Sequence, residues 1–225
     1  MNKELIINNK HYKKAANLES LNMFKGQLYE TIVTTESNEH VKNAAPIGVI
    51  CKDSNHVVIH LDNCIHTQLN IMENGELIVN ITKDPLIFTY STLGELDDEY
   101  FGQFNGFPMI NDSLGFFKAN VVKTIEKKRE NDYNDGIGNV VTCEVEDIYI
   151  SDNNEIVPLN RAMNAVIESL IYYCRFDHKY KDIQKEIWTH MKELNRVCQK
   201  VGNESEKESM KLILDKLKKN HAYLE

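Results

Sequence analysis

The sequence predicts an α+β fold that is mainly β, with a β-barrel or sandwich followed by a C-terminal helical extension. Between about residues 26 and 156, short runs of β-branched and aromatic residues alternate with Gly, Asn and Asp, which is typical of such sheets. After Pro158, residues that cap helices mark out a series of helices. We therefore expect an N-terminal arm with a short helix over residues 1–25, a β domain over 26–157 and a helical extension over 158–225.

Five segments of the β domain are predicted to be strands because they are dense in Val, Ile, Leu, Thr and aromatic residues. They are residues 28–34, 56–61, 77–81, 116–125 and 140–150. The last two are long and apolar. A barrel of this size would leave such strands partly uncovered unless another surface packs on them.

The segment NAAPIG, residues 43–48, is unusual because it runs directly into apolar Val49 but is made of small residues around a proline. Small side chains leave the backbone uncovered, so a flat ligand could approach it closely. Pro46 fixes φ and has no N–H, and we expect it to turn neighbouring amides away from the sheet. The alternative is a β-bulge or an edge-strand proline with no ligand.

A short helix is predicted between the strands 56–61 and 77–81. Asp62 or Asn63 can cap it, and residues 74–75, Asn-Gly, end it. Its apolar residues at helical spacing are Ile65, Leu69 and Met72.

Three helices are predicted after Pro158. Asn160 can cap a helix over residues 160–176, and a second helix covers 180–201. Ser205 and Glu208 have the spacing of a capping box for a third.

Composition excludes several classes of protein. The chain of 225 residues is 42% hydrophobic, which is enough to bury a core. Its net charge is −8, and its cations are dispersed except at residues 127–129, so we expect no nucleic-acid partner. The first residues lack the apolar core of a signal peptide, and no apolar run could cross a bilayer, so we expect a cytoplasmic protein without membrane contact.

The cysteines suggest neither a disulfide framework nor a metal site. They are odd in number, widely separated and without a C-x-x-C pair: Cys51, Cys64, Cys143, Cys174 and Cys198. The sequence also lacks G-x-S-x-G, H-E-x-x-H and Walker motifs. We expect reduced thiols, no bound metal and no hydrolytic centre.

Three motifs in fixed order resemble the FMN-binding split β-barrel of the flavin reductase type. They are the Thr pair 34–35, the NAAPIG segment, and HTQLNIMENGELIVNI over residues 66–81, which fits T-x-x-N-I-x-x-x-G-E-[FL]-[VI]-V-N. A narrower resemblance covers nearly the whole chain, including YETIVTT and NRAMNAVIESLI. It is to the mainly archaeal family of unknown function numbered 447, which is similar to the split barrels.

The resemblance implies that FMN is the cofactor. An isoalloxazine edge needs nearby backbone N–H and C=O groups, which NAAPIG would supply, and the phosphate needs donors at a strand end and a helix start. The implied cofactor-binding residues are Thr34, Thr35, Asn43, Ala44, Ala45, Pro46, Ile47, Gly48, His66, Thr67 and Asn70. The alternatives are that the threonines are ordinary strand or helix-start residues and that His66 is structural.

The resemblance also implies a homodimer with FMN at the subunit interface and a small-molecule redox partner. The implied function is an FMN-dependent oxidoreductase that passes hydride between a reduced nicotinamide or deazaflavin and an acceptor. No catalytic side chain is assigned, because the flavin carries that chemistry. The alternatives are a non-catalytic FMN carrier and a binding module with an empty barrel.

Two features concern the substrate side of this site. Gly48 stands where flavin reductases often have Ser, and residues 52–55, KDSN, replace their S-x-x-P-P loop. The resemblance therefore assigns neither a contact to flavin N5 nor a substrate pocket in this chain. A segment rich in aromatics is predicted to be a loop that either packs as a crossover or stacks over a flavin. Its residues are Tyr90, Tyr100, Phe101, Phe104 and Phe107.

Overall fold

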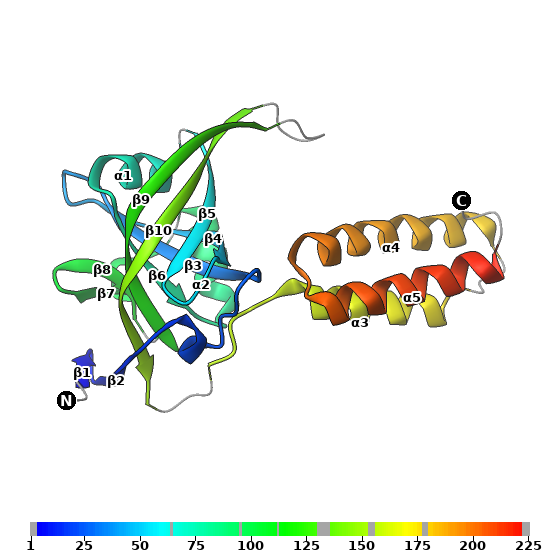
Figure 1. Cartoon of the computed structure of the whole chain (residues 1–225), viewed down its shortest axis with the longest axis horizontal. Helices are drawn as coiled ribbons and strands as arrows, with labels where there is room; N and C mark the ends of the chain where they lie inside the picture. Colours follow the sequence, from blue (N-terminus) through cyan, green and yellow to red (C-terminus); the bar gives the residue numbers. More distant parts are fainter. Residues whose placement is uncertain are drawn as a thin grey trace. The chain divides into compact units, whose positions relative to one another are not determined.

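A computed structural model shows two compact units (Figure 1). The barrel unit is Met1–Leu159 and the helical unit is Asn160–Glu225. The structure describes residues 4–63, 65–94, 96–111, 113–129, 136–152, 156–176 and 180–221. Cys64 lies outside the described residues.

The barrel unit is built on an eight-stranded sheet in the order β1-β2-β10-β5-β4-β3-β6-β9, and a further pairing of β9 with β10 closes six of these strands into a barrel. Every pairing in it is antiparallel. The strands are β1 (Glu4–Ile7), β2 (Lys10–Ala15), β3 (Leu28–Glu36), β4 (Lys42–Cys51), β5 (His56–Asp62), β6 (Glu76–Ile81), β9 (Gly115–Arg129) and β10 (Gly136–Ser151). The mainly β fold with C-terminal helices is therefore confirmed, as a barrel and not a sandwich.

The long hairpin of β9 and β10 gives the barrel its curvature. Its register shifts twice, between Thr142 and Cys143 and between Val145 and Asp147. Such irregularities bend a strand and increase its twist. β10 can therefore pair with β9 along its length and also with β5 and β2 on its other edge.

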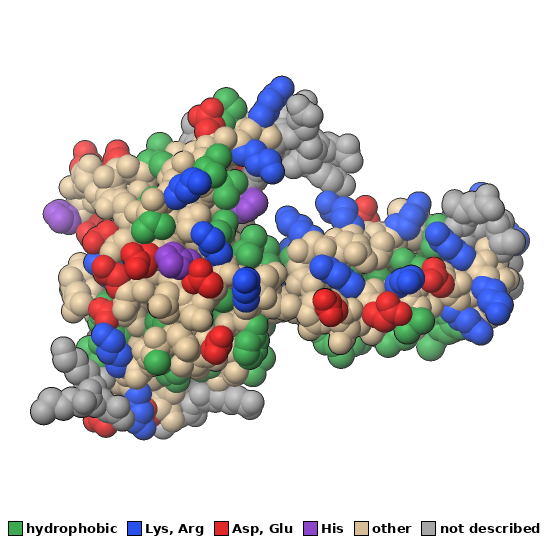
Figure 2. Space-filling view, in the orientation of Figure 1, with side chains coloured by type: hydrophobic (Ala, Val, Ile, Leu, Met, Phe, Trp, Pro, Cys, Tyr) green, Lys and Arg blue, Asp and Glu red, His purple; other side chains and the backbone are tan. Residues whose placement is uncertain are grey.

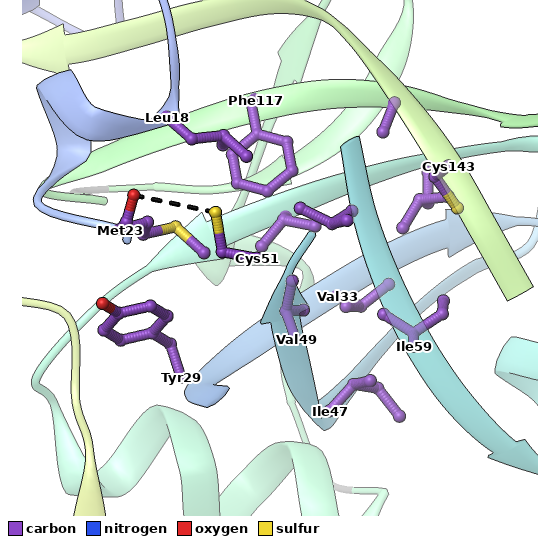
Figure 3. Close-up of a cluster of buried hydrophobic side chains, with 14 of the residues drawn as sticks. Leu18, Met23, Tyr29, Val33, Ile47, Val49, Cys51, Ile59, Phe117 and Cys143 are labelled. Atoms are coloured by element: carbon purple, nitrogen blue, oxygen red, sulfur yellow. Dashed lines mark hydrogen bonds between the residues drawn. The ribbon is translucent and has the colours of Figure 1, made fainter. Parts of the chain in front are cut away.

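The core fills the barrel with alternate residues of the strands (Figure 3). Val49, Cys51 and Ile59 are at most 2% exposed. Burial raises the pKa of the Cys143 thiol to about 12, and burial together with Asp53 and Glu19 raises the pKa of Cys51 to about 11. Both thiols are protonated at neutral pH and act as packing groups.

Helix α1 (His66–Asn74) buries a side that combines polar and apolar residues, and its Ile71 joins the core of the barrel. Its buried residues are Thr67, Asn70 and Ile71. The predicted apolar stripe is exposed instead, at 37% for Ile65, 46% for Leu69 and 40% for Met72. The predicted cap by Asp62 or Asn63 is also wrong, because the N-cap is Ile65, with no side-chain hydrogen bond.

Several elements were not predicted. They are β1, β2, the helix α2 (Pro85–Leu93), the hairpin of β7 (Phe101–Phe104) and β8 (Phe107–Ile110), and the 3-10 turn η2 (Asp98–Tyr100). The 3-10 helix η1 (Leu18–Leu21) lies within the N-terminal arm, where a short helix was expected. The aromatic segment contributes this hairpin and does not remain a loop. The ring of Phe104 packs edge-on against those of Phe116 and Tyr149, with 5.2 Å between centroids in each case.

The helical unit contains α3 (Arg161–Cys174), α4 (Lys181–Val201) and α5 (Glu204–Asn220). Asn160 caps α3 as predicted, by accepting a hydrogen bond from the Ala162 N–H. The capping box of α5 is formed by Asn203 and Glu206, so the predicted pair Ser205 and Glu208 is wrong. Among the described residues, no helix is both long and apolar enough to cross a membrane.

We predict that Asn203→Ala destabilises the start of α5 by about 1 kcal/mol, because the N-cap acceptor for the Glu206 N–H is lost. Hydrogen exchange of α5 peptides in the full-length protein would measure this. Ser205→Ala is the matched control and should leave exchange unchanged. Equal effects of the two variants would contradict the assignment of the cap.

Candidate functional site

The candidate site begins with the unequal pairing of β4. Residues 42–50 of β4 pair with β3 without a break in register, whereas only residues 49–51 pair with β5. At the end of β4, the Cys51 N–H donates to the Gln27 C=O at 3.0 Å, and the Cys51 C=O accepts from the Gly26 N–H at 2.7 Å. Backbone groups of successive residues in a strand point to opposite edges. Odd-numbered residues of β4 therefore face β3.

Even-numbered residues consequently face the other edge, where β5 has separated from β4. Ala44 and Pro46 direct their backbone groups to this edge, with which no described strand pairs beyond residues 49–51, and Gly48 lies at the fork. Pro46 fits here because its missing N–H would have no ladder partner. The predicted turning of amides away from the sheet is not seen, since the pairing with β3 continues through Pro46.

The small side chains of this segment lie on two faces. Ala45 and Ile47 point into the barrel and pack with its core. Ala44 lies on the outer face and packs against the buried cluster of Ile32, Ile87 and Ile110. The outer face of this segment therefore carries only small side chains beside the unpaired backbone edge.

A buried polar cluster fixes α1 to the ends of β3 and β4. The Asn43 Nδ2 donates to Thr67 Oγ1 at 2.9 Å and to Thr35 Oγ1 at 3.2 Å, and Asn70 Nδ2 donates to Thr35 Oγ1 at 3.0 Å. Thr35 and Thr67 are at most 1% exposed. Four of the predicted site residues are thus brought together.

Thr34 lies apart from this cluster. Its hydroxyl donates to the Pro108 C=O at 2.7 Å and accepts from Asn80 Nδ2 at 3.1 Å. Asn80 also donates to the Ile32 C=O at 3.0 Å and accepts from the Ile110 N–H at 2.9 Å. Thr34 and Asn80 therefore connect β3, β6 and β8 inside the framework.

A cavity of about 500 Å³ adjoins the start of β4. This is within the usual size range of small-molecule sites. Its lining residues are His40, Val41, Lys42, Asn43, Ala44, His66, Ser91, Gly94, Leu96, Asp98 and Phe101. Three of them, Asn43, Ala44 and His66, were predicted from sequence. Lys42 could have been suspected because it directly precedes NAAPIG, but no sequence signal marked Ser91 on the unpredicted helix α2.

Charges at the cavity are balanced. Lys42 Nζ lies 3.1 Å from Asp98 Oδ1 and 5.5 Å from the centroid of the Phe101 ring. Over the face of the barrel unit in Figure 2, acidic and basic side chains are interspersed. Among the described residues, no group of three or more His, Cys, Asp or Glu side chains could hold a metal ion.

The arrangement suits a planar ligand that also carries an anionic group. The unpaired edge of β4 offers backbone donors and acceptors in one line. His66 begins α1, which has no side-chain cap. The first N–H groups of a helix lack partners within the helix and favour anions.

Comparison with known proteins matches the chain to two family models. Residues 29–157 match the model described as the N-terminal domain of a protein of unknown function (DUF447), and residues 160–215 match that of DUF447 proteins of unknown function.

Three solved structures illustrate what the chain is similar to. An FMN-bound DUF447 protein, MM1853 from Methanosarcina mazei, is 23% identical, with 88% of this chain and 99% of that chain covered and a TM-score of 0.49. A putative flavin reductase with a split barrel domain from Shewanella frigidimarina is 16% identical, with 64% and 85% covered and a TM-score of 0.45. Flavoredoxin from Methanosarcina acetivorans is 18% identical, with 62% and 78% covered and a TM-score of 0.45.

We predict that Asn43→Ala lowers the free energy of unfolding of the barrel unit by about 1–3 kcal/mol, because the buried Thr67 hydroxyl loses the Asn43 donor and the Thr35 hydroxyl keeps only the donor from Asn70. Urea denaturation followed by near-UV circular dichroism would measure it. Asn74→Ala is the control, because it removes a hydrogen bond at an exposed position. A loss no larger than that of the control would show that the cluster does not hold α1.

Proposed function

The chain belongs to the DUF447 family, and from this premise we propose that it is an FMN-binding flavoprotein that passes hydride between a reduced nicotinamide or deazaflavin and an acceptor. The observation that carries the proposal is the unpaired edge of β4 beside the cavity. The FMN-bound DUF447 protein from Methanosarcina mazei and the flavin reductase of split-barrel fold support it as analogues.

The isoalloxazine ring is assigned to the unpaired edge. Its pyrimidine side presents O2 and O4 as acceptors and N3–H as a donor. Ala44 offers an N–H and a C=O, Pro46 offers a C=O, and Gly48 at the fork offers no side chain that would block the approach. Ala45 and Ile47 contribute by anchoring this backbone in the core.

The phosphate is assigned to the start of α1. His66 and Thr67 lie in its first turn, and Asn43 lines the same cavity as His66. Thr35 and Asn70 hold this turn in place through the polar cluster. Thr34 has a structural part, since its hydroxyl is bonded inside the framework.

When bound, FMN would supply the hydride chemistry itself. The chain then has to hold the ring edge, neutralise the phosphate and exclude water. No acid or base side chain is assigned to the hydride transfer itself, because the flavin carries that chemistry.

We infer that a second copy of the chain covers the site. Apolar side chains stand exposed at or beside the residues that line the cavity: Val41 is 60% exposed, Leu93 63% and Ile65 37%. Exposed apolar groups next to a ligand site favour burial by a partner. In a two-fold homodimer, two equivalent flavin sites would be completed together.

The test of the function is a titration of the purified protein with FMN and riboflavin, followed by flavin fluorescence. We expect a clear preference for FMN, because riboflavin lacks the phosphate, and rapid bleaching of the bound flavin on mixing with a reduced donor. Thr67→Ala should weaken FMN by about 1–3 kcal/mol and leave riboflavin nearly unchanged. Equal affinity for FMN and riboflavin would contradict the proposed phosphate site. If no reduced donor bleaches the bound flavin, the protein is an FMN carrier and not an oxidoreductase.

We also predict that Ala44→Pro weakens FMN at least tenfold while the barrel stays folded. The substitution removes an N–H from the unpaired edge and leaves the hydrogen bonds to β3 intact. Ala45→Pro is the matched control, since the N–H it removes faces β3, and it should lower the melting temperature. Unchanged FMN affinity in a folded Ala44→Pro protein would place the ring elsewhere.

A further inference from the structure

Ser91 on helix α2 carries a hydroxyl that the fold does not use. The residue is 8% exposed, and its Oγ is buried without a hydrogen-bond partner among the described residues. Two other hydroxyls of the same helix bond back one turn: Thr89 to the Pro85 C=O at 2.8 Å and Thr92 to the Phe88 C=O at 2.7 Å. The Ser91 hydroxyl could donate to the backbone C=O one turn earlier in the same way, but it does not. Leaving a buried hydroxyl unpaired costs stability, so the group needs an explanation.

The position of Ser91 in the fold suggests why its hydroxyl is unpaired. It lies one turn after Ile87, the other buried residue of α2, and Ile87 belongs to the buried cluster against which Ala44 of β4 packs. Ser91 and Ala44 both line the cavity. The Ala44 side chain is only a methyl group and therefore takes up little of this cavity.

The rest of the lining limits what could fill this space. The cavity has an apolar lining from Ala44, Leu96 and Phe101 and a polar lining that includes His66 and Asn43, to which the phosphate is assigned. Lys42 is paired with Asp98, so these two side chains add little net charge. Apolar side chains with a few polar groups that fix the orientation are typical of sites for flat rings.

We propose that this cavity receives the heterocyclic ring of the redox partner and that the Ser91 hydroxyl hydrogen-bonds to the amide edge of that ring. The inference rests on the proposed function and specifies its second ligand. The carboxamide of a nicotinamide and the pyrimidinedione of a deazaflavin share this chemistry, a planar ring with an adjacent N–H donor and C=O acceptor. Ser91 then acts as a specificity residue for the partner and not for FMN.

Ser91→Ala tests the proposal because its two expected effects have opposite signs. Removal of an unpaired hydroxyl should raise the melting temperature of the ligand-free protein by about 2–4 °C. The same change should weaken the partner about fivefold to tenfold. The partner affinity is the concentration dependence of FMN reduction in stopped flow with NADH and, separately, with a reduced 8-hydroxy-5-deazaflavin. The donor whose affinity falls identifies the source of the ring.

Ser169→Ala is the matched control. Ser169 is fully buried in α3, and its Oγ also has no partner among the described residues, but it does not line the cavity. The Ser169→Ala protein should also have a raised melting temperature, and its affinity for either donor should not change. A loss confined to Ser91→Ala would thus not be a general effect of removing a buried hydroxyl.

Three results would overturn the proposal: unchanged affinity for both donors, an equal loss of FMN affinity in Ser91→Ala, or a lower melting temperature in this variant. If the wild-type protein binds no FMN, the proposed function fails. Calorimetric titration of the FMN-free protein with NADH and with the deazaflavin still decides whether the cavity holds the ring. Binding that Ser91→Ala weakens would support the proposal, and absence of binding would overturn it.

Discussion

β4 is fully bonded on one edge and almost unbonded on the other, and the candidate site depends on this asymmetry. β5 leaves β4 because it continues along β10, with which residues 56–62 are paired throughout. The divergence leaves room for α1, whose polar side is attached to the ends of β3 and β4 by Asn43 and Asn70. The cavity, the uncapped helix start and the free backbone groups therefore meet at the same end of one strand.

The motif that suggested this site serves two separate purposes. Asn43, Thr67 and Asn70 lie at the site, whereas Thr34 and Asn80 lie inside the framework and connect three strands. Both groups must occur at fixed spacing, because a framework that shifts β6 would also shift the helix preceding it. A motif read only as ligand contacts would assign too many of its residues to the ligand.

The strands and the order of the motifs could be predicted from the sequence because they depend on local composition and alternation. The buried side of α1 could not. The spacing of Ile65, Leu69 and Met72 predicts the opposite orientation. Thr67 and Asn70 face inward because Thr35 and Asn43 on the neighbouring strands supply hydrogen-bond partners, and Ile71 joins the core beside them. Helix α2 and the β7–β8 hairpin were missed for a similar reason, since their apolar residues pack on the barrel and show no clear period of their own. Ser91 could therefore not be predicted as a cavity residue, whereas Asn43, Ala44 and His66 of the same cavity were predicted from the sequence.

The proline of β4 has one more consequence, which concerns association between chains. An unpaired strand edge is a template on which a strand of another molecule can add, the first step toward domain swapping or fibril growth. On this edge the donor at position 46 is missing, so an incoming strand would meet a gap in its ladder in the middle of the exposed stretch. A small planar molecule, which needs only a few matched groups, would not be hindered in this way. By this argument, Pro46 would oppose strand addition at this edge without blocking the approach of a compact ligand.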